Sequence, residues 1–373
     1  MNLNDDMRRA DATPGNGRGE FARSLGIDPL HIEMTNVCNF DCSFCPISRS
    51  TRTPGRMDID LFKNIVNEVA ENGVAKRIGF HVMGEPLLHP GIFSAIGYVA
   101  EKDLRSTLTT NGGLLVNSKV QDLVKSPLNS LAISLETNNA GEHESRRSGL
   151  DFSIYYDRVL QAIAELREKS KTYITIHLMN TITKKLFMLD DNTGINIRKW
   201  NLREKIGTLI GDIRRAIGRP LSRKEIEKKT AKIKLNSLQH IEIDEQIQIY
   251  IQFFWDWGNA FTARRAFRAK IGCCGYAGRN AAVLHDGRVT LCCGDYDGRT
   301  ALGRVQDSSL VTLLESAIMR RVTGGFARGR VVHPYCQRCM GSIGPIATLL
   351  KGLASIYLFR RRGHPLKAAK KSF

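Results

Sequence analysis

Residues 34–46 read MTNVCNFDCSFCP and place three cysteines in the spacing C-x3-C-x2-C. Cys38, Cys42 and Cys45 directly follow an apolar, β-branched run, so we expect the motif on a loop at the end of a strand. Thiolates are soft ligands that suit zinc or iron–sulfur clusters. Three thiolates leave one iron of a cubane cluster free for an outside ligand, whereas a fourth Cys or His normally closes a structural zinc site. The spacing alone leaves both metals open, and also three buried thiols.

Length and composition narrow the class of protein. The chain has 373 residues, of which 42% are apolar, and nine are cysteine. This length allows two or three domains, and the apolar runs are too short for a membrane span of ~20 residues. The first 20 residues contain no apolar stretch typical of a signal peptide, so we expect a cytoplasmic protein. Thiols stay reduced in the cytoplasm, so we expect the cysteines to bind metal ions or clusters rather than to form disulfides.

Two segments carry almost all of the net charge of +18. Residues 198–234 contain thirteen Lys or Arg and four Asp or Glu, and residues 351–373 contain seven Lys or Arg and no acid. These segments are interpreted as a basic insertion and a basic tail on a nearly neutral chain. Solvated surfaces explain them as well as binding to nucleic acid does. The helix expected over 346–359, followed by three arginines, can pack in a core or contact an anionic membrane at the inner face.

The hydrophobic pattern predicts an α/β fold. Helical periodicity at 60–72 and 152–169 alternates with short β-branched runs, which favours a parallel sheet covered by helices. Six strands suit an open partial barrel or a doubly wound sheet, and periodicity does not separate the two. Two further short strands, 281–284 and 288–292, flank a turn at Asp286 and Gly287. The six main strands are expected at 30–35, 77–83, 106–110, 130–135, 173–179 and 246–254.

The domain organisation follows from shifts in composition. Residues 1–28 are polar and Gly-rich, and we expect them to be mobile. Residues 29–258 are expected to form the α/β domain, with the basic helical insertion at about 190–240. Residues 268–342 are rich in Gly and Cys and are expected to form a second, small domain, with a boundary near 258–270. A basic C-terminal helix and tail then occupy 345–373.

The first cysteine motif and its context resemble the radical S-adenosylmethionine (SAM) superfamily. Phe44 precedes the third cysteine, and Met83-Gly84-Glu85-Pro86 resembles the Gly-Gly-Glu-Pro motif, with Met in place of the first Gly. The resemblance implies a partial (β/α)6 TIM-like barrel with a SAM-binding [4Fe-4S] cluster on the three cysteines. It also implies a set of SAM-contacting residues at C-terminal strand ends, the edge where barrels place their sites. That set is Phe44, Met83, Gly84, Glu85, Asn111, Ser134, Glu136 and Arg147.

The six remaining cysteines resemble the SPASM/Twitch extension of this superfamily. Gly287, four residues and Cys292 are followed by Cys336-x2-Cys339, and no cysteine follows Cys339. A full SPASM domain continues with two more cysteines, so the chain is similar to the shorter Twitch form with one auxiliary [4Fe-4S] cluster. Neighbouring residues of an extended chain point to opposite sides, so one member of each vicinal pair is expected to bind. The expected ligands are Cys274, Cys292, Cys336 and Cys339, which leaves Cys273 and Cys293 as buried thiols or, for one of them, a hydrogen-atom donor.

The resemblance implies reductive cleavage of SAM to a 5′-deoxyadenosyl radical that abstracts a hydrogen from a substrate C–H, with the auxiliary cluster as electron acceptor. We expect dehydrogenation or epimerisation of a small sugar-like molecule or a peptide, with electrons from a flavodoxin or ferredoxin. Asp295 is a candidate base for the proton lost, although a turn can equally explain it. The competing hypothesis is a zinc-stabilised, basic protein that binds nucleic acid.

Overall fold

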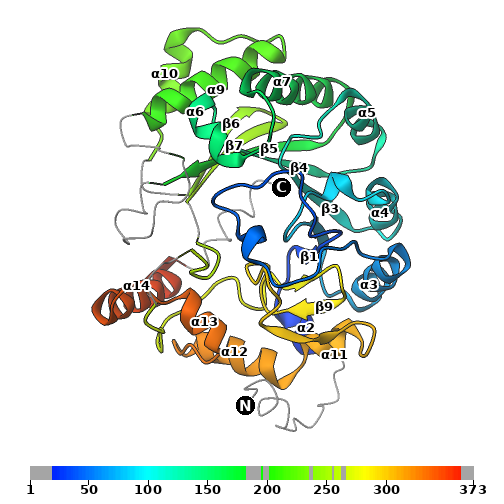
Figure 1. Cartoon of the computed structure of the whole chain (residues 1–373), viewed down its shortest axis with the longest axis vertical. Helices are drawn as coiled ribbons and strands as arrows, with labels where there is room; N and C mark the ends of the chain where they lie inside the picture. Colours follow the sequence, from blue (N-terminus) through cyan, green and yellow to red (C-terminus); the bar gives the residue numbers. More distant parts are fainter. Residues whose placement is uncertain are drawn as a thin grey trace. The chain divides into compact units, whose positions relative to one another are not determined.

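The computed structural model describes residues 19–181, 195, 201–234, 238–253, 256–261 and 266–362. The chain folds as two compact units (Figure 1). Unit 1 comprises residues 1–33, 49–78 and 256–373, and unit 2 comprises residues 34–48 and 79–255. Expectations for residues 1–18, 190–194, 196–200, 235–237, 254, 262–265 and 363–373 lie outside the described part.

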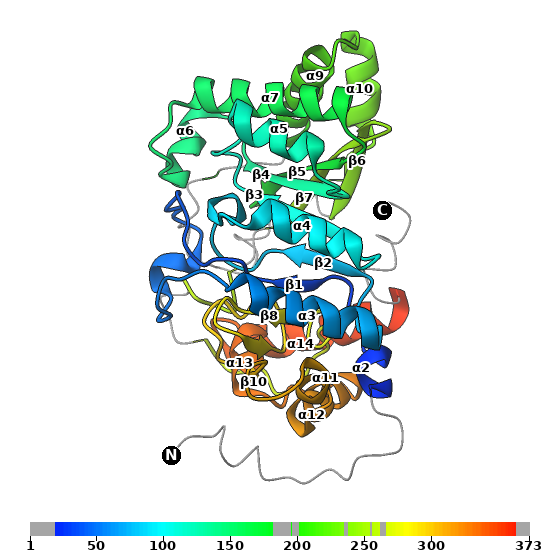
Figure 2. The same cartoon turned by 90° about the vertical axis from the view of Figure 1, so that its right-hand side faces the viewer.

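Unit 2 contains a parallel sheet covered by helices. Strands β3 (Arg105–Thr110), β4 (Ser130–Glu136), β5 (Tyr173–Asn180) and β7 (Ile247–Phe253) follow one another in parallel pairing, and β6 (Gln239–Asp244) closes the edge antiparallel to β7. Figures 1 and 2 show helices along one face of these strands. The helices of this unit are α4 (Ile92–Glu101), α5 (Asn117–Lys125), α6 (Ala140–His143), α7 (Phe152–Lys169), α9 (Leu202–Ala216) and α10 (Arg223–Ala231), with short 3-10 turns η2 (Pro86–Leu88) and η3 (Glu144–Arg146).

Unit 1 combines the start of the α/β fold with the cysteine-rich segment. Its strands follow the order β10-β9-β8-β1, in which β1 pairs parallel with β8 and the other two pairs are antiparallel. Strand β2 (Arg77–Phe80) and the turn η1 (Pro46–Arg49) cross the boundary between the units. The other elements are β1 (Leu30–Ile32), β8 (Ala282–Val283), β9 (Arg288–Thr290), β10 (Ala301–Arg304), α2 (Glu20–Ser24), α3 (Ile59–Asn72), α11 (Leu310–Leu314), α12 (Ala317–Ala327), α13 (Pro334–Cys339) and α14 (Pro345–Arg362).

Helix α7 shows how local sequence produces these elements. Asp151 caps it by accepting hydrogen bonds from the backbone N–H groups of Ser153 and Ile154. Such a cap satisfies donors that the first turn leaves without a partner. The apolar positions on its inward face recur at helical spacing, and Tyr155 and Leu166 among them are fully buried. The helix therefore begins and ends where the periodicity predicts, at residues 152 and 169.

The predicted α/β fold with a partial barrel is confirmed. The six predicted strands correspond to β1, β2, β3, β4, β5 and β7, and α9 and α10 lie in the basic insertion. The turn at Asp286 joins the antiparallel strands β8 and β9 as expected. Strand β6 was not predicted, and neither was α2, which lies within the segment expected to be mobile. Strand β6 alternates polar and apolar residues on one exposed edge, a pattern that the neighbouring charged insertion obscures.

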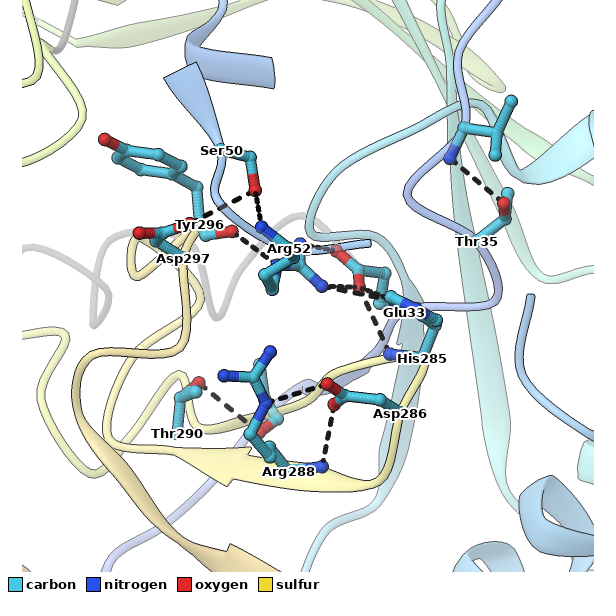
Figure 3. A network of polar contacts seen from close by, with 12 residues as sticks. Glu33, Thr35, Ser50, Arg52, His285, Asp286, Arg288, Thr290, Tyr296 and Asp297 are labelled. Carbon is cyan, nitrogen blue, oxygen red and sulfur yellow. Dashed lines mark hydrogen bonds and ion pairs between the residues drawn. The ribbon is translucent and has the colours of Figure 1, made fainter. Parts of the chain in front are cut away.

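A buried ion pair joins two distant segments of unit 1 (Figure 3). Both guanidinium amino groups of Arg52 bind the carboxylate of Glu33, at 2.5 and 2.7 Å, and both side chains are almost fully buried. The backbone N–H of His285 also donates to Glu33, and Arg52 Nε donates to the carbonyl of Tyr296. Burial alone would raise the pKa of Glu33, but the hydrogen bonds from Arg52 and His285 outweigh it and lower the pKa to about 2.

The same network holds the loop that follows Cys292. Asp297 accepts hydrogen bonds from the backbone and hydroxyl of Thr51 and from the hydroxyl of Ser50. Together with the bond from Arg52 to Tyr296, these hydrogen bonds attach residues 296 and 297 to the segment 50–52. The ion pair therefore positions the loop that begins at Cys292, one of the expected ligands.

Candidate functional site

The three cysteines of the first motif lie together on a loop of unit 2. Cys38, Cys42 and Cys45 are partly buried and unpaired by disulfides. Burial raises the pKa of all three thiols, and the neighbouring Cys42 and Cys38 raise that of Cys45 further. The pKa of Cys42 rises to about 11. Free thiols in this position are protonated, and a metal that binds them must displace the protons.

The loop is held from both sides by backbone contacts. The N–H of Ser43 donates to the carbonyl of Ser145, and the N–H of Glu85 donates to the carbonyl of Val37. Gly84 has a φ of 75°, and a Cβ at this position would lie 2.3 Å from the carbonyl oxygen of Thr35. Only glycine allows this close approach. The Met83-Gly84-Glu85-Pro86 motif therefore packs its backbone directly against the segment that leads into Cys38.

Glu85 is buried and holds the end of β3. Its carboxylate accepts hydrogen bonds from the hydroxyl of Thr110, the N–H of Asn111 and the N–H of Leu87. Burial raises the pKa of Glu85 to about 7 despite these hydrogen bonds, which act in the opposite direction. Asn111 in turn directs its side-chain amide toward the Sγ atom of Cys38, at 3.6 Å, and toward Asn39, at 2.9 Å. Glu85 thus orients a residue that contacts the cysteine loop.

Arg146 is a site residue that was not predicted from the sequence. It is fully buried and donates to the carbonyls of Leu135 and Asn111, both at 3.0 Å, and to the hydroxyl of Tyr155 at 2.6 Å. It also lies over the ring of Phe40 and interacts with the thiol of Cys42. Its neighbour Arg147, named by the resemblance, is largely exposed and pairs with Asp41 at 3.2 Å. The sequence does place two adjacent arginines after the fourth strand, but it does not show which of the two side chains turns into the site.

The remaining expected residues lie at or near the same strand ends. Glu136 ends β4 with a φ of 64°, is buried and accepts two hydrogen bonds from Gln252. Burial raises the pKa of Glu136 to about 7, although Arg146 acts against the rise. Ser134 lies half-buried two residues earlier, at a register shift in the pairing with β5. Phe44 and Met83 are buried beside the cysteine loop and the strand end.

Four cysteines of unit 1 form a second group. Cys336 and Cys339 lie three residues apart on α13, so their side chains share one helix face. The thiols of Cys274 and Cys292 interact with both, and burial raises the pKa of Cys274 and Cys339 to about 11 and about 12. Cys273 is directed elsewhere, because its thiol donates to the carbonyl of Phe326 at 3.2 Å.

Cys293 and Asp295 lie beside this second group. A hydrogen bond joins the thiols of Cys293 and Cys292, and it is the main cause of the raised pKa of Cys292. Asp295 is fully buried, and its Oδ2 atom accepts hydrogen bonds from the backbone and hydroxyl of Thr300. Its Oδ1 atom is buried with no hydrogen-bond partner among the described residues. Asp295 therefore has a turn-stabilising contact and one free acceptor atom.

Both groups consist of cysteine thiols, the soft donors that iron–sulfur clusters use. A cubane cluster spreads its cysteine ligands over separate iron atoms, so three thiols on one loop and four in the second group match the ligand sets that the resemblance implies. The residues present therefore fit the groups that the resemblance implies.

Two family models match the parts of the chain that carry the cysteine groups. Residues 32–188 match the model of the radical SAM superfamily, and residues 273–340 match that of the SPASM iron–sulfur cluster-binding domain. The chain is therefore a radical SAM protein with a C-terminal SPASM domain. It binds SAM and iron–sulfur clusters, as members of this class do.

The curated relatives match over only part of their length. An AdoMet-dependent heme synthase of Methanosarcina barkeri is 31% identical over 154 residues, which cover 41% of this chain and 42% of the relative. An S-adenosyl-L-methionine-dependent 2-deoxy-scyllo-inosamine dehydrogenase of Niallia circulans is 30% identical over 125 residues, or 33% and 49% of the two chains. The matched regions thus span less than half of these relatives.

A solved structure shows the same fold at low identity. The crystal structure of Streptococcus suis SuiB bound to precursor peptide SuiA has a TM-score of 0.53 and 13% identity, and the match covers 87% of this chain and 73% of that one. The likeness supports the α/β architecture followed by the cysteine-rich domain.

Replacing Gly84 with Ala should disturb the first cysteine loop specifically. The added Cβ would clash with the carbonyls of Thr35 and Val37, at 2.3 and 2.7 Å, and force apart the segments that position Cys38. We expect purified Gly84→Ala to bind about half the wild-type iron, because only the first cluster is lost. Gly97→Ala is the matched control: it lies within α4, has open space around its Cα and should keep full iron. Equal iron contents of the two variants would contradict this account of the loop.

Proposed function

We propose that this protein is a radical SAM oxidoreductase that abstracts a hydrogen from a substrate C–H and passes the resulting electron to an auxiliary [4Fe-4S] cluster. The observation that carries the proposal is the pair of cysteine groups, three thiols on a strand-end loop and four in the SPASM domain. When bound, SAM and its cluster supply the 5′-deoxyadenosyl radical. The protein's own residues position SAM and the substrate, exclude water from the site and balance its charge.

The chain's own residues have distinct roles in this proposal. Cys38, Cys42 and Cys45 would hold the first cluster and leave it open to SAM. The backbone at Met83 and Gly84 would bind the amino group of SAM, and Glu85 positions Asn111 at the end of β3. The buried cation of Arg146 offsets the negative charge that three thiolates bring into the site. The other proposed SAM contacts are Phe44, Ser134, Glu136 and Arg147.

Dehydrogenation and epimerisation of a sugar-like or peptide substrate are the proposed reactions. In dehydrogenation the substrate radical loses an electron to the auxiliary cluster and a proton to a base, whereas in epimerisation it takes a hydrogen atom from the thiol of Cys273 or Cys293. Support for a sugar-like substrate comes from the related 2-deoxy-scyllo-inosamine dehydrogenase. Support for a peptide comes from the subtilosin biosynthesis protein AlbA of Bacillus subtilis, which is 30% identical over 125 residues, or 32% of this chain and 27% of the relative. Asp295, with its free Oδ1 atom beside the second cysteine group, is the proposed acceptor of the proton that dehydrogenation releases.

The setting of the reaction is also a proposal. A flavodoxin or ferredoxin is the proposed electron donor, since reductive cleavage requires one low-potential electron. None of the helices within the described residues could cross a membrane. We propose a cytoplasmic protein whose C-terminal end contacts the inner face of the membrane. The two family matches favour this enzyme over the zinc-stabilised protein that binds nucleic acid.

Removal of the first three cysteines tests the radical chemistry. The Cys38→Ala, Cys42→Ala, Cys45→Ala triple variant should lose about half of the iron and form no 5′-deoxyadenosine with SAM and dithionite. The reason is that no other described thiols are grouped beside Gly84 and Asn111. Liquid chromatography of the quenched reaction measures the product. Cleavage of SAM by the triple variant at the wild-type rate would refute the assignment.

The vicinal pair Cys273 and Cys274 offers a matched test of the auxiliary cluster. In the triple-variant background, reconstituted protein should retain about four irons per chain. Adding Cys274→Ala should remove most of this iron, because its thiol lies with those of Cys292, Cys336 and Cys339. Adding Cys273→Ala should leave it in place, because that thiol binds the carbonyl of Phe326. Zinc in place of iron, or the opposite ranking of the two variants, would show that the ligand set is wrong.

Deuterated substrates distinguish the reactions. With wild-type protein, SAM and dithionite, deuterium should move from the substrate C–H into 5′-deoxyadenosine, as mass spectrometry detects. Dehydrogenation removes the deuterium and one further hydrogen from the substrate, whereas epimerisation replaces the deuterium with solvent hydrogen and so lowers the mass by about one unit. An inosamine-type amino sugar and a cysteine-containing peptide are the first probes. Absence of transfer from both classes, with SAM cleavage intact, would exclude both as substrates.

A further inference from the structure

Helix α14 packs on unit 1 through small and polar residues. The hydroxyl of Thr348 accepts a hydrogen bond from the N–H of Ser342, and the hydroxyl of Ser355 accepts one from the N–H of Cys273. A Cβ on Gly352 would lie 2.6 Å from the carbonyl of Ile271, so the helix approaches the backbone closely at this point. The ammonium group of Lys351 donates to the carbonyl of Gly341, at 2.9 Å. The face toward the protein is therefore mainly small and polar, with the half-buried Ile356 at its edge, near Gly329.

The opposite face of α14 carries large apolar side chains in solvent. Ile346, Leu349, Leu350 and Leu353 are 73, 50, 61 and 49% exposed. Their spacing of i, i+3, i+4 and i+7 forms one continuous helical stripe. A terminal helix packed in a core would direct this stripe inward and its Thr and Ser outward. The observed helix does the reverse, so core packing does not explain its sequence.

Charge indicates what covers the stripe. Residues 345–373 contain no Asp or Glu, and Arg360-Arg361-Arg362 directly follow the apolar part of the helix. A second copy of this chain docked on the same stripe would offer no acidic group from this segment to the basic end. An anionic bilayer offers both complements, an acyl region for the leucines and phosphates for the arginines. Since no helix in the described part of the chain can span a bilayer, the helix has to lie along its surface.

We propose that α14 is a membrane-docking helix that lies in the interface of an anionic bilayer, with its leucine stripe in the acyl boundary and its basic end at the phosphates. The proposed location does not depend on which substrate the enzyme oxidises. Figure 1 shows α14 at the margin of unit 1, beside α13. Docking through the outward stripe leaves every inward contact of Thr348, Gly352 and Ser355 intact.

Vesicle sedimentation with full-length, cluster-loaded protein tests the proposal. The probes are vesicles of phosphatidylcholine alone and of phosphatidylcholine with phosphatidylglycerol. Wild-type protein should sediment with the anionic vesicles, and salt should weaken the binding because the arginine contacts are screened. Leu350→Gln, Leu353→Gln should lower the partition coefficient by about tenfold or more, since both side chains leave the acyl boundary. Changing the three arginines to Gln should weaken the binding to anionic vesicles and reduce its salt dependence, which four lysines of residues 351–373 partly maintain.

Two controls separate loss of docking from loss of folding. Ile154→Gln replaces an apolar residue that is 58% exposed on α7, and it should bind vesicles as wild type does. Iron content and SAM cleavage of each variant report whether the protein still folds. Substitution is preferable to truncation because the inward face of α14 contacts the segment at Cys273.

Three results would overturn the proposal. The first is a wild-type protein that stays in the supernatant with anionic vesicles even at low salt. The second is a leucine double variant that binds these vesicles as well as wild type does. The third is a wild-type dimer in light scattering that this variant converts to a monomer, which would assign the stripe to a second copy.

Discussion

The arrangement of unit 2 around the cysteine loop depends on the contacts made by one buried group, the guanidinium of Arg146. Its hydrogen bonds join the end of β3 at Asn111, the end of β4 at Leu135 and helix α7 at Tyr155. It also contacts the cysteine loop through the ring of Phe40 and the thiol of Cys42. A buried cation is expensive unless acceptors surround it, and here both terminal amino groups have acceptors, while the buried Nε has no hydrogen-bond partner among the described residues. Three carbonyl or hydroxyl oxygens fix its plane, and the aromatic ring covers it. The position of the cysteine loop therefore follows from a charge that the fold must satisfy.

Burial also sets the chemical state of the site. Glu85 and Glu136 both have a pKa raised to about 7, so each exchanges between its neutral and ionised forms near neutral pH. The three thiols are protonated when free, since burial raises their pKa. Metal binding converts the three neutral thiols to thiolates. The positive charge of Arg146, already in place, offsets the negative charge that these thiolates bring into the site.

Much of this arrangement could be predicted from sequence, and the exceptions have physical reasons. The cysteine spacings, the six main strands and helix α7 are local patterns, and the structure reproduces the strands and the helix. The choice between Arg146 and Arg147 depends on a turn whose last residue adopts a φ of 44°, which no periodicity reveals. The outward direction of the stripe on α14 was equally hidden, because an amphipathic pattern does not tell which face meets the protein. The partners of Glu33 were missed because His285 lies 252 residues away in the chain.

The discontinuity of unit 1 bears on the order of events during synthesis. Residues 34–48 and 79–255 form unit 2, so a ribosome has made all of its parts before the last third of the chain exists. Strand β1 pairs in parallel with Ala282 and Val283, which are synthesised long after β1 itself. During that interval an apolar edge strand has no partner on that side, which is the condition in which nascent chains attract chaperones or aggregate. The sheet of unit 1 is therefore expected to form only after Ala282 and Val283 of the SPASM segment have been synthesised.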